Sequence, residues 1–307
     1  MKVPVDLVLA GNLLVDDVVH ADGRTRMGEA GGAMLYASLG AALWGARVGV
    51  VSVVGSDYPE ETLAALGARG VDLGGLRRLD RPGLRTWLLY ERETRRVLNQ
   101  LGGPTHEEVS PEPEHLPEAY ESARAFHLSP MPLARQRAWV EHLGSRRGTT
   151  LSLDPHESVR EENLAPWLET LKNVDVFFTA EDELRLDGAS RDPRAALRRL
   201  ASGRLDLVAF KRGACGGLLL HSSGERFLEW SPSAVVVVDP TGAGDAFAGG
   251  FLAGLIAGVG LERALQQGAV SAGFAIEEWG ARCLLQATRE QAERRRREWF
   301  DSAMRLP

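Results

Sequence analysis

Cysteine and long apolar runs are scarce in this sequence. Only Cys215 and Cys283 are present, which excludes a disulfide framework or a cysteine-ligated metal cluster, and we expect both in the core of a protein from a reducing compartment. No segment approaches the roughly 20 apolar residues that cross a bilayer, and the first residues lack the apolar core of a signal peptide. The sequence therefore predicts cytoplasmic localisation and no membrane partner.

Positive charge is the second scarcity. Acidic residues outnumber basic ones by 42 to 36, which gives a net charge of -6 and a pI near 5.7. This balance argues against a nucleic-acid partner held by phosphate contacts, although one site can still be positive enough for a small anion. Lysine is the rarer basic residue, with only Lys2, Lys172 and Lys211 present. Lys211 is therefore a candidate functional residue.

What the sequence does contain is a regular alternation of apolar strands and helices. Residues 6–11, 48–54, 125–128, 149–153, 174–178 and 205–210 read as strands, and helical stretches separate most of them, as in parallel βαβ units. The alternation stops between about residues 73 and 101, where residues 84–90 and 96–101 resemble a hairpin. Together with residues 13–30, this hairpin predicts a small antiparallel sheet that could serve as a lid. The fold class is therefore α/β, with a mostly parallel central sheet flanked by helices.

One stretch has the composition of an anion site. The residues Val235 to Val238 favour a strand, Pro240 ends it, and the glycines that follow favour a tight turn before a helix near Asp245. Unpaired backbone N–H groups and the partial positive charge at a helix start bind phosphate or a developing oxyanion. The stretch therefore predicts strand, turn and helix around a phosphate.

Asp245 needs its own explanation, because a carboxylate repels a bound phosphate. It could take a proton from a hydroxyl that attacks the phosphate. The simpler alternative is an acidic residue that stabilises the helix dipole beside a plain glycine turn. The first alternative predicts phosphoryl transfer to an alcohol.

The full string Asp-Pro-Thr-Gly-Ala-Gly-Asp-Ala-Phe, residues 239–247, resembles the second signature of the ribokinase-like (PfkB-type) carbohydrate kinases. The resemblance implies a ribokinase-like fold, ATP as co-substrate, Mg²⁺, Asp245 as the catalytic base, and a monovalent cation such as K⁺ near Asp239. It also implies an anion hole made by the N–H groups of Gly242, Ala243 and Gly244.

The acceptor-binding half of the family pattern is recognisable but altered. Gly31 and Gly32 before a helix resemble the first signature, whose glycine pair touches the sugar, although alone they could be a simple turn. Asp16 resembles the carboxylate that binds two hydroxyls of the acceptor; a solvated strand-end residue is the alternative, which we favour for Asp17. Tyr36 and Leu14 stand where the family often has Asn. These departures favour an acceptor other than ribose, such as an inositol-like polyol or a nucleoside.

Other segments resemble the nucleotide side of the family site. A strand-end loop that approaches the nucleotide in the family is matched by Lys211, Gly213 and Gly216. Thr241 is also assigned to nucleotide binding. Residues 268–280 would form a wall of the adenine pocket. Glu183 remains from a motif linked to Mg²⁺ and would act through water; an exposed helix carboxylate is the alternative. His156, after Asp-Pro, is either a polar wall of the cleft or a surface residue.

Taken together, the sequence predicts one ribokinase-like kinase domain over residues 1–307, with lid strands from about 13–30 and 84–101. We expect an ATP-dependent kinase that phosphorylates a hydroxyl of a sugar, polyol or nucleoside. An idle sensor that binds nucleotide or sugar is the alternative, motivated by Tyr36, Ala180 and Val270, which stand where the family often has Asn. No Gly-x-Gly-x-x-Gly follows the first strand, which excludes a Rossmann dehydrogenase. The edges of the lid sheet allow a homodimer, which the sequence leaves open.

Overall fold

The centre of the molecule is a nine-stranded sheet in the order β15-β14-β13-β11-β9-β8-β1-β4-β5. The computed structural model describes residues 4–91, 94–232 and 234–304. The sheet is parallel except for β14 and β15, which form an antiparallel hairpin at one edge. Its strands are β1 (Leu7–Ala10), β4 (Val48–Val54), β5 (Asp72–Arg78), β8 (Ala125–Leu128), β9 (Thr150–Leu153), β11 (Val176–Ala180), β13 (Leu207–Lys211), β14 (Gly217–His221) and β15 (Arg226–Trp230).

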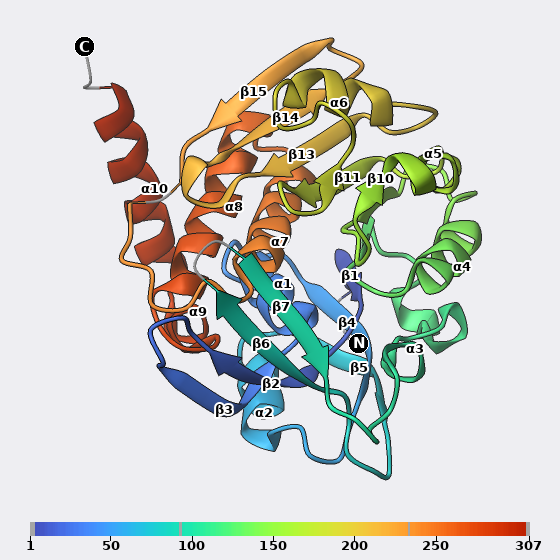
Figure 1. Ribbon diagram of the computed structural model, residues 1–307, viewed down its shortest axis with the longest axis vertical. Coiled ribbons are helices and arrows are strands. Elements are labelled where there is room, and N and C mark those ends of the chain that lie inside the picture. The colour runs from blue at the N-terminus through green and yellow to red at the C-terminus, as the bar shows by residue number, and fades with distance from the viewer. Residues whose placement is uncertain (1–3, 92–93, 233, 305–307) are drawn as a thin grey trace.

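Helices cover both faces of this sheet and bury a hydrophobic core on each (Figure 1). One core includes residues of α1 (Ala33–Ala42), α2 (Glu60–Ala68), α7 (Ala243–Ile256) and α8 (Leu261–Ile276), and the other includes residues of α4 (Leu133–Leu143), α5 (Leu164–Leu171) and α6 (Pro193–Leu200). Strands covered on both faces are continuously apolar, and all seven residues of β4 are buried. The predicted α/β class is therefore confirmed.

The helices α1 and α7 pack against each other more closely than side chains normally permit. A Cβ atom added to Gly40 would overlap the carbonyl oxygen of Ala246, and one added to Gly249 would overlap that of Ala37. Two positions without a Cβ thus bring the backbones together. As a result, residues 34–41 of α1 are buried all round.

A second, four-stranded sheet forms the predicted lid. Its order is β3-β2-β6-β7, with bounds β3 (Thr25–Gly31), β2 (Leu14–Val19), β6 (Arg85–Glu91) and β7 (Thr94–Asn99). The β2–β3 and β6–β7 pairs are antiparallel, and the central β2–β6 pair is parallel. In Figure 1 this sheet lies across the region of α1 and α7, so it covers one end of the central layers.

Two expectations about secondary structure, a strand at residues 235–238 and a helix at residues 181–186, were wrong. Residues 235–238 form no strand: they run irregularly beside the end of α8, where the N–H groups of Val238 and Asp239 donate to Ile276 O, and Val236 is 81% exposed. Residues 181–186 form a turn and the short strand β12 (Leu184–Arg185), not a helix, because they pair with β10 (Val159–Arg160). The strand β5, which was not assigned from the sequence, pairs with β4 and extends the central sheet.

The positions of the two cysteines differ from the sequence-based expectation. Cys215 is exposed and Cys283 is half-buried, so neither is the core residue we expected.

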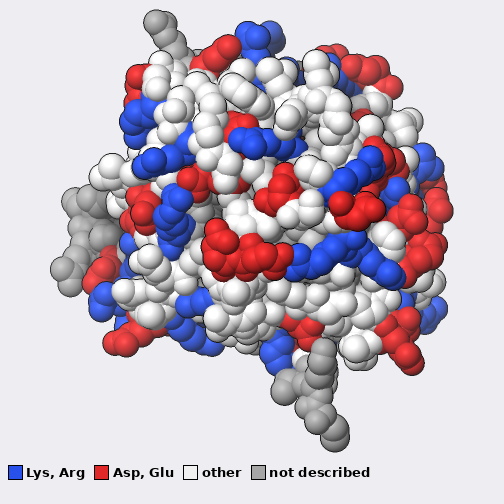
Figure 2. All heavy atoms as spheres, turned by 90° about the horizontal axis from the view of Figure 1, so that it is seen from below, with Lys and Arg blue, Asp and Glu red and all other residues white. Residues whose placement is uncertain are grey.

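Among the described residues, every helix is too short or too polar to span a bilayer. Figure 2 shows basic and acidic side chains intermingled on the face it presents, without a patch of one sign. The remaining helices are α3 (His106–Val109), α9 (Arg282–Gln286) and α10 (Arg289–Met304).

Candidate active site

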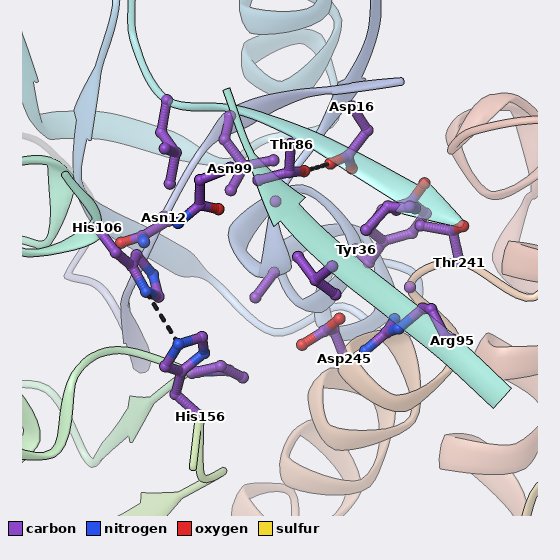
Figure 3. A pocket seen from close by; sticks show the side chains of 18 residues that line it. Asn12, Asp16, Tyr36, Thr86, Arg95, Asn99, His106, His156, Thr241 and Asp245 are labelled. Carbon is purple, nitrogen blue, oxygen red and sulfur yellow. Dashed lines mark hydrogen bonds between the residues drawn. The ribbon is translucent and has the colours of Figure 1, made fainter. Parts of the chain in front are cut away.

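The lid and the central layers enclose one pocket that joins residues from distant parts of the chain (Figure 3). Its lining includes six residues predicted from the sequence: Asp16, Gly32, Tyr36, Thr241, Gly242 and Asp245. They meet because the N-terminal parts of α1 and α7 pack together and the lid strand β2 contributes Asp16 to the same lining. The structure thus brings the acceptor-binding and the phosphate-binding halves of the sequence pattern to a single cavity.

The glycine turn before α7 has the geometry of an anion site. Gly242 is the N-cap residue and adopts the left-handed conformation, with φ 76°, which glycine adopts without strain. Among the described residues, the backbone N–H groups of Gly242 and Gly244 donate to no protein acceptor. The Ala243 N–H lies 3.4 Å from the Pro240 carbonyl oxygen, so it is less free than its neighbours. Two of the three predicted donors are therefore available to a ligand.

Asp245 lies in the first turn of α7 and points into the pocket. Burial raises the pKa of its carboxyl to about 6; Asp154 raises it further, while Lys211 and Arg95 oppose the shift. The group is therefore ionised at neutral pH yet close enough in pKa to accept a proton. This is the protonation behaviour that a general base requires.

Asp16, on the lid strand β2, is buried and lines the pocket, so the alternative of a solvated residue is wrong. Its Oδ1 accepts a hydrogen bond from Thr86 of β6, and a Cβ added to Gly31 would overlap its Oδ2. Burial raises the pKa of this carboxyl to about 7, although the Thr86 hydroxyl lowers it. Hydroxyl donors from a ligand would therefore stabilise the ionised form. Neighbouring Asp17 is buried as well and pairs with Arg85 at 2.7 Å, which corrects our expectation of a solvated side chain.

Tyr36 is 2% exposed and contacts the turn of α7. A Cβ added to Gly242 would overlap its ring, so this glycine is required for close approach as well as for its backbone angles. Burial holds the pKa of the phenol well above its usual value, and Asp16 and Asp239 raise it further. A neutral phenol at this position is a hydrogen-bonding group that faces both halves of the site.

Lys211 lies close to the glycine turn before α7 and is not a solvated strand end. Its Nζ donates to Asp154 Oδ2 at 2.6 Å and lies 3.1 Å from the position of a Cβ on Gly244. Burial alone would lower the pKa of Lys211, but Asp154 and Glu183 outweigh burial and raise it. The ammonium group is therefore a fixed positive charge near the N-terminus of α7.

Glu183 is half-buried and lies in a turn, so the alternative of an exposed helix carboxylate is wrong. Burial raises the pKa of its carboxyl to about 8, and Lys211 opposes the shift. Its Oε2 has no hydrogen-bond partner among the described residues. A carboxylate oxygen in this position is available to a hydrated divalent cation, because such a cation would offset the cost of removing the charge from water.

Thr241 and Asp239 link the glycine turn before α7 to the lid. Asp239 is 1% exposed, and its Oδ1 accepts from the N–H and the hydroxyl of Thr241 at 3.0 and 2.6 Å. Tyr90 of β6 lies 2.8 Å from the Thr241 hydroxyl, and His20 Nε2 lies 3.6 Å from Asp239 Oδ1. The lid is therefore held directly against the turn.

The other predicted nucleotide residues lie outside this pocket. Gly213 is exposed in a short turn after β13, and Gly216 has φ 71° where its backbone approaches Trp230. Neither lines the pocket that contains Asp245. Their assignment to nucleotide binding stays a prediction. Residues 268–275 belong to buried α8, in which Val270 is fully buried.

Several residues that line the pocket were missed from the sequence: Asn12, Thr86, Arg95, Asn99 and His106. The lid strands contained a usable signal, because alternate residues of a strand point to opposite faces. Arg95, Val97 and Asn99 of β7 line the pocket, and Trp87 and Leu98 are among the exposed hydrophobic residues. Once Asp16 is placed facing inward, the same period of two identifies Thr86 on β6 and these β7 residues.

Comparison with known proteins agrees with this geometry. The family model for pfkB family carbohydrate kinases matches residues 5–287. A cytidine kinase from Thermococcus kodakarensis is 32% identical over 280 residues, which cover 90% of this chain and 97% of that protein.

Solved structures share the fold at low sequence identity. A putative ribokinase II from E. coli, in complex with ATP and Mg²⁺, has a TM-score of 0.75 at 19% identity and covers 96% of this chain and 99% of its own. A nucleoside kinase from Burkholderia thailandensis, in complex with inosine, has a TM-score of 0.77 at 17% identity and covers 96% of this chain and 98% of its own.

Proposed function

Since the chain belongs to the pfkB family of carbohydrate kinases, we propose that the hydroxyl it phosphorylates is carried by a nucleoside. The protein is an ATP-dependent kinase that transfers the γ-phosphoryl group to a hydroxyl of a sugar, polyol or nucleoside, and the idle sensor is not supported. ATP and Mg²⁺ are general for such kinases. The nucleoside is favoured by the cytidine kinase relative, which aligns with nearly the whole chain.

The observation that carries the proposal is that Asp16 and Asp245 line the same pocket. A carboxylate presents two acceptor oxygens, which match the vicinal 2′- and 3′-hydroxyls of a ribonucleoside. With the diol on Asp16, the 5′-hydroxyl would face Asp245, which takes its proton as the oxygen attacks phosphorus. We assign these two roles to Asp16 and Asp245, with Gly31, Gly32 and Tyr36 shaping the acceptor site.

Positive groups from three elements would stabilise the phosphoryl group during transfer. These are the N–H groups of Gly242 and Gly244, the Lys211 ammonium beneath the turn, and Arg95 from the lid. When bound, Mg²⁺ would neutralise phosphate charge near Glu183 through water. Thr241, Gly213, Gly216 and Ala243 belong to the proposed nucleotide side. Among the described residues, Asp239 accepts hydrogen bonds from the neutral groups of Thr241 and Gly280, and His20 Nε2 lies 3.6 Å from its Oδ1. K⁺ beside Asp239 would balance a buried negative charge and should raise initial rates above those in tetramethylammonium chloride.

We also propose a homodimer through the outer face of the lid and a cytoplasmic location. Trp87 of β6 and Leu98 of β7 are paired in register and are 39% and 52% exposed. A second copy that covers these side chains would remove apolar surface from water. Replacing both by Ser should then convert a dimer into a monomer in light-scattering measurements, and an unchanged mass would refute this interface.

The experiment that tests the function is a panel of acceptors assayed with ATP and Mg²⁺. Cytidine, uridine, adenosine, inosine, ribose, fructose and myo-inositol are compared by kcat/KM, and products are identified by mass spectrometry and ³¹P NMR. We expect a nucleoside 5′-monophosphate as the main product. Loss of the 2′-hydroxyl, as in 2′-deoxycytidine, should lower kcat/KM by at least about tenfold, since it removes one hydrogen bond to Asp16. A free sugar or inositol as the best acceptor would refute the nucleoside proposal.

A further inference from the structure

Two histidines meet at one side of the pocket, away from Arg95 and Thr241 (Figure 3). His106 is the first residue of α3, and His156 follows β9, so the pair joins segments 50 positions apart in the chain. His106 Nδ1 lies 3.3 Å from His156 Nε2, and the rings meet edge to face with centroids 4.3 Å apart. The catalytic assignment above uses neither residue.

Both imidazoles are neutral at pH 7. Desolvation lowers the pKa of His106 to about 4, and a charge on His156 would lower it further; desolvation also lowers the pKa of His156. A neutral imidazole has one N–H donor and one acceptor nitrogen. Because the shared hydrogen bond uses one donor and one acceptor, the two outer nitrogens, His106 Nε2 and His156 Nδ1, provide the other donor and the other acceptor. If both rings change tautomer together, these two roles are exchanged.

Asn12 adds an amide donor to the same pocket. Its side chain is 2% exposed, and its Nδ2 is buried with no partner among the described residues. Its Oδ1 lies 3.3 Å from the Ser110 hydroxyl, which also donates to His106 O at 2.7 Å. A buried amide donor without an acceptor costs free energy that a ligand carbonyl oxygen would recover. Leu14, Val97 and Pro130 also line the pocket and offer apolar surface to a flat ring.

We propose that His106, His156 and Asn12 bind the base of the acceptor and select pyrimidine nucleosides. The proposal rests on the nucleoside function proposed above. Cytosine presents an acceptor at N3 beside a donor at N4, and uracil presents a donor at N3 beside an acceptor at O4. The histidine pair matches either edge by changing tautomer, and Asn12 Nδ2 donates to the O2 carbonyl that both bases share. The same site therefore accepts cytidine and uridine.

The first test uses the unmodified protein with ATP and Mg²⁺ and compares kcat/KM for cytidine, uridine, 3-methyluridine and adenosine. We expect cytidine and uridine to agree within about tenfold. We expect 3-methyluridine to be worse than uridine by at least about tenfold, since the methyl group removes the N3 donor and leaves a histidine nitrogen unpaired. Equal use of 3-methyluridine and uridine, or adenosine as the best acceptor, would overturn the proposal.

The second test replaces each histidine of the pair. His106→Phe and His156→Phe keep a ring and remove both nitrogens, and His142→Phe, on the exposed side of α4, is the matched control. Each pair variant should raise KM for cytidine at least about tenfold while kcat changes less than about threefold, because the phosphoryl-transfer residues are untouched. The control should behave as the unmodified protein.

The melting temperature of each variant is measured first, and a poorly folded Phe variant is replaced by the Gln variant at the same position. His156 is exposed, so its variants have little packing to disturb. Unchanged KM in folded variants would refute base binding by the pair while leaving the nucleoside kinase proposal intact. A protein that phosphorylates no nucleoside at all would refute both proposals.

Discussion

Asp245→Asn should lower the rate of phosphoryl transfer and raise the stability of the fold. The carboxylate is needed as a proton acceptor, but its burial in the ionised form destabilises the folded protein. Replacing it removes the proton acceptor, and general base catalysis is commonly worth about 10² to 10⁴ in rate. We expect kcat to fall by about that factor. The affinity for ATP should change less than about threefold, since the N–H groups of the turn and Lys211 remain in place.

The same substitution should stabilise the fold at high pH. The folded-state pKa of Asp245 is raised from 3.8 to about 6, mainly by burial, so the ionised group costs stability. The cost appears as pH rises through this interval and is complete above it; a shift of this size corresponds to at most about 3 kcal/mol. Because Asp245 is partly exposed, we expect Asp245→Asn to gain about 1 to 3 kcal/mol at pH 8 and little at pH 4.

Urea unfolding at the two pH values, steady-state rates and calorimetric titration of ATP measure these effects. Asp80→Asn is the matched control, because Asp80 is exposed in a loop outside the pocket. Turnover by Asp245→Asn at the unmodified rate would refute the catalytic base. A loss of activity with equal stability at pH 8 would keep the base but refute the burial cost assigned to it.

Three further predictions follow from the buried charges and the lid. Lys211→Met should lower the free energy of unfolding in urea by about 3 to 5 kcal/mol, since it leaves Asp154 buried without its partner. The exposed control Lys172→Met should change it by less than about 0.5 kcal/mol. Equal effects of the two substitutions would contradict the buried pair. The value of kcat/KM should fall as pH drops below about 7. Asp16 and Asp245, with pKa values of about 7 and 6, must both be ionised for activity. A flat profile of kcat/KM between pH 8 and pH 5 would refute this requirement. Arg95→Met should lower kcat at least about tenfold, because it removes a positive charge from the pocket. The control Arg96→Met changes a residue of the same strand that does not line the pocket, and should leave kcat unchanged. Similar rates in both variants would refute a role of Arg95 in phosphoryl transfer.

Much of the site was predictable because its residues lie in local patterns. The glycine turn and Asp245 are neighbours in sequence, so their chemistry is readable without a fold. The strand assigned before the turn was wrong for the opposite reason. A run of valines favours β structure, but residues 235–238 pair with no strand in the part of the chain that the structure describes and lie partly exposed beside α8.

The paired histidines show what sequence position cannot reveal. His156 read equally well as a surface residue or as a wall of the cleft, and nothing near it in the chain points to His106. Only the packing of α3 beside the end of β9 brings their nitrogens to 3.3 Å. The environment of Lys211 was hidden for the same reason, since its partner Asp154 comes from a different strand of the central sheet.

By itself, then, the sequence determined the α/β class and the phosphoryl-transfer chemistry, because both depend on short-range periodicity and on residues a few positions apart. The tertiary structure decided which side chains meet at the pocket and which groups surround the phosphoryl acceptor. It also decided which carboxyl groups are buried, and burial raises their pKa. Those properties arise from long-range packing, in which Gly40 and Gly249 let α1 and α7 approach and the lid brings Asp16 into the same pocket as Asp245.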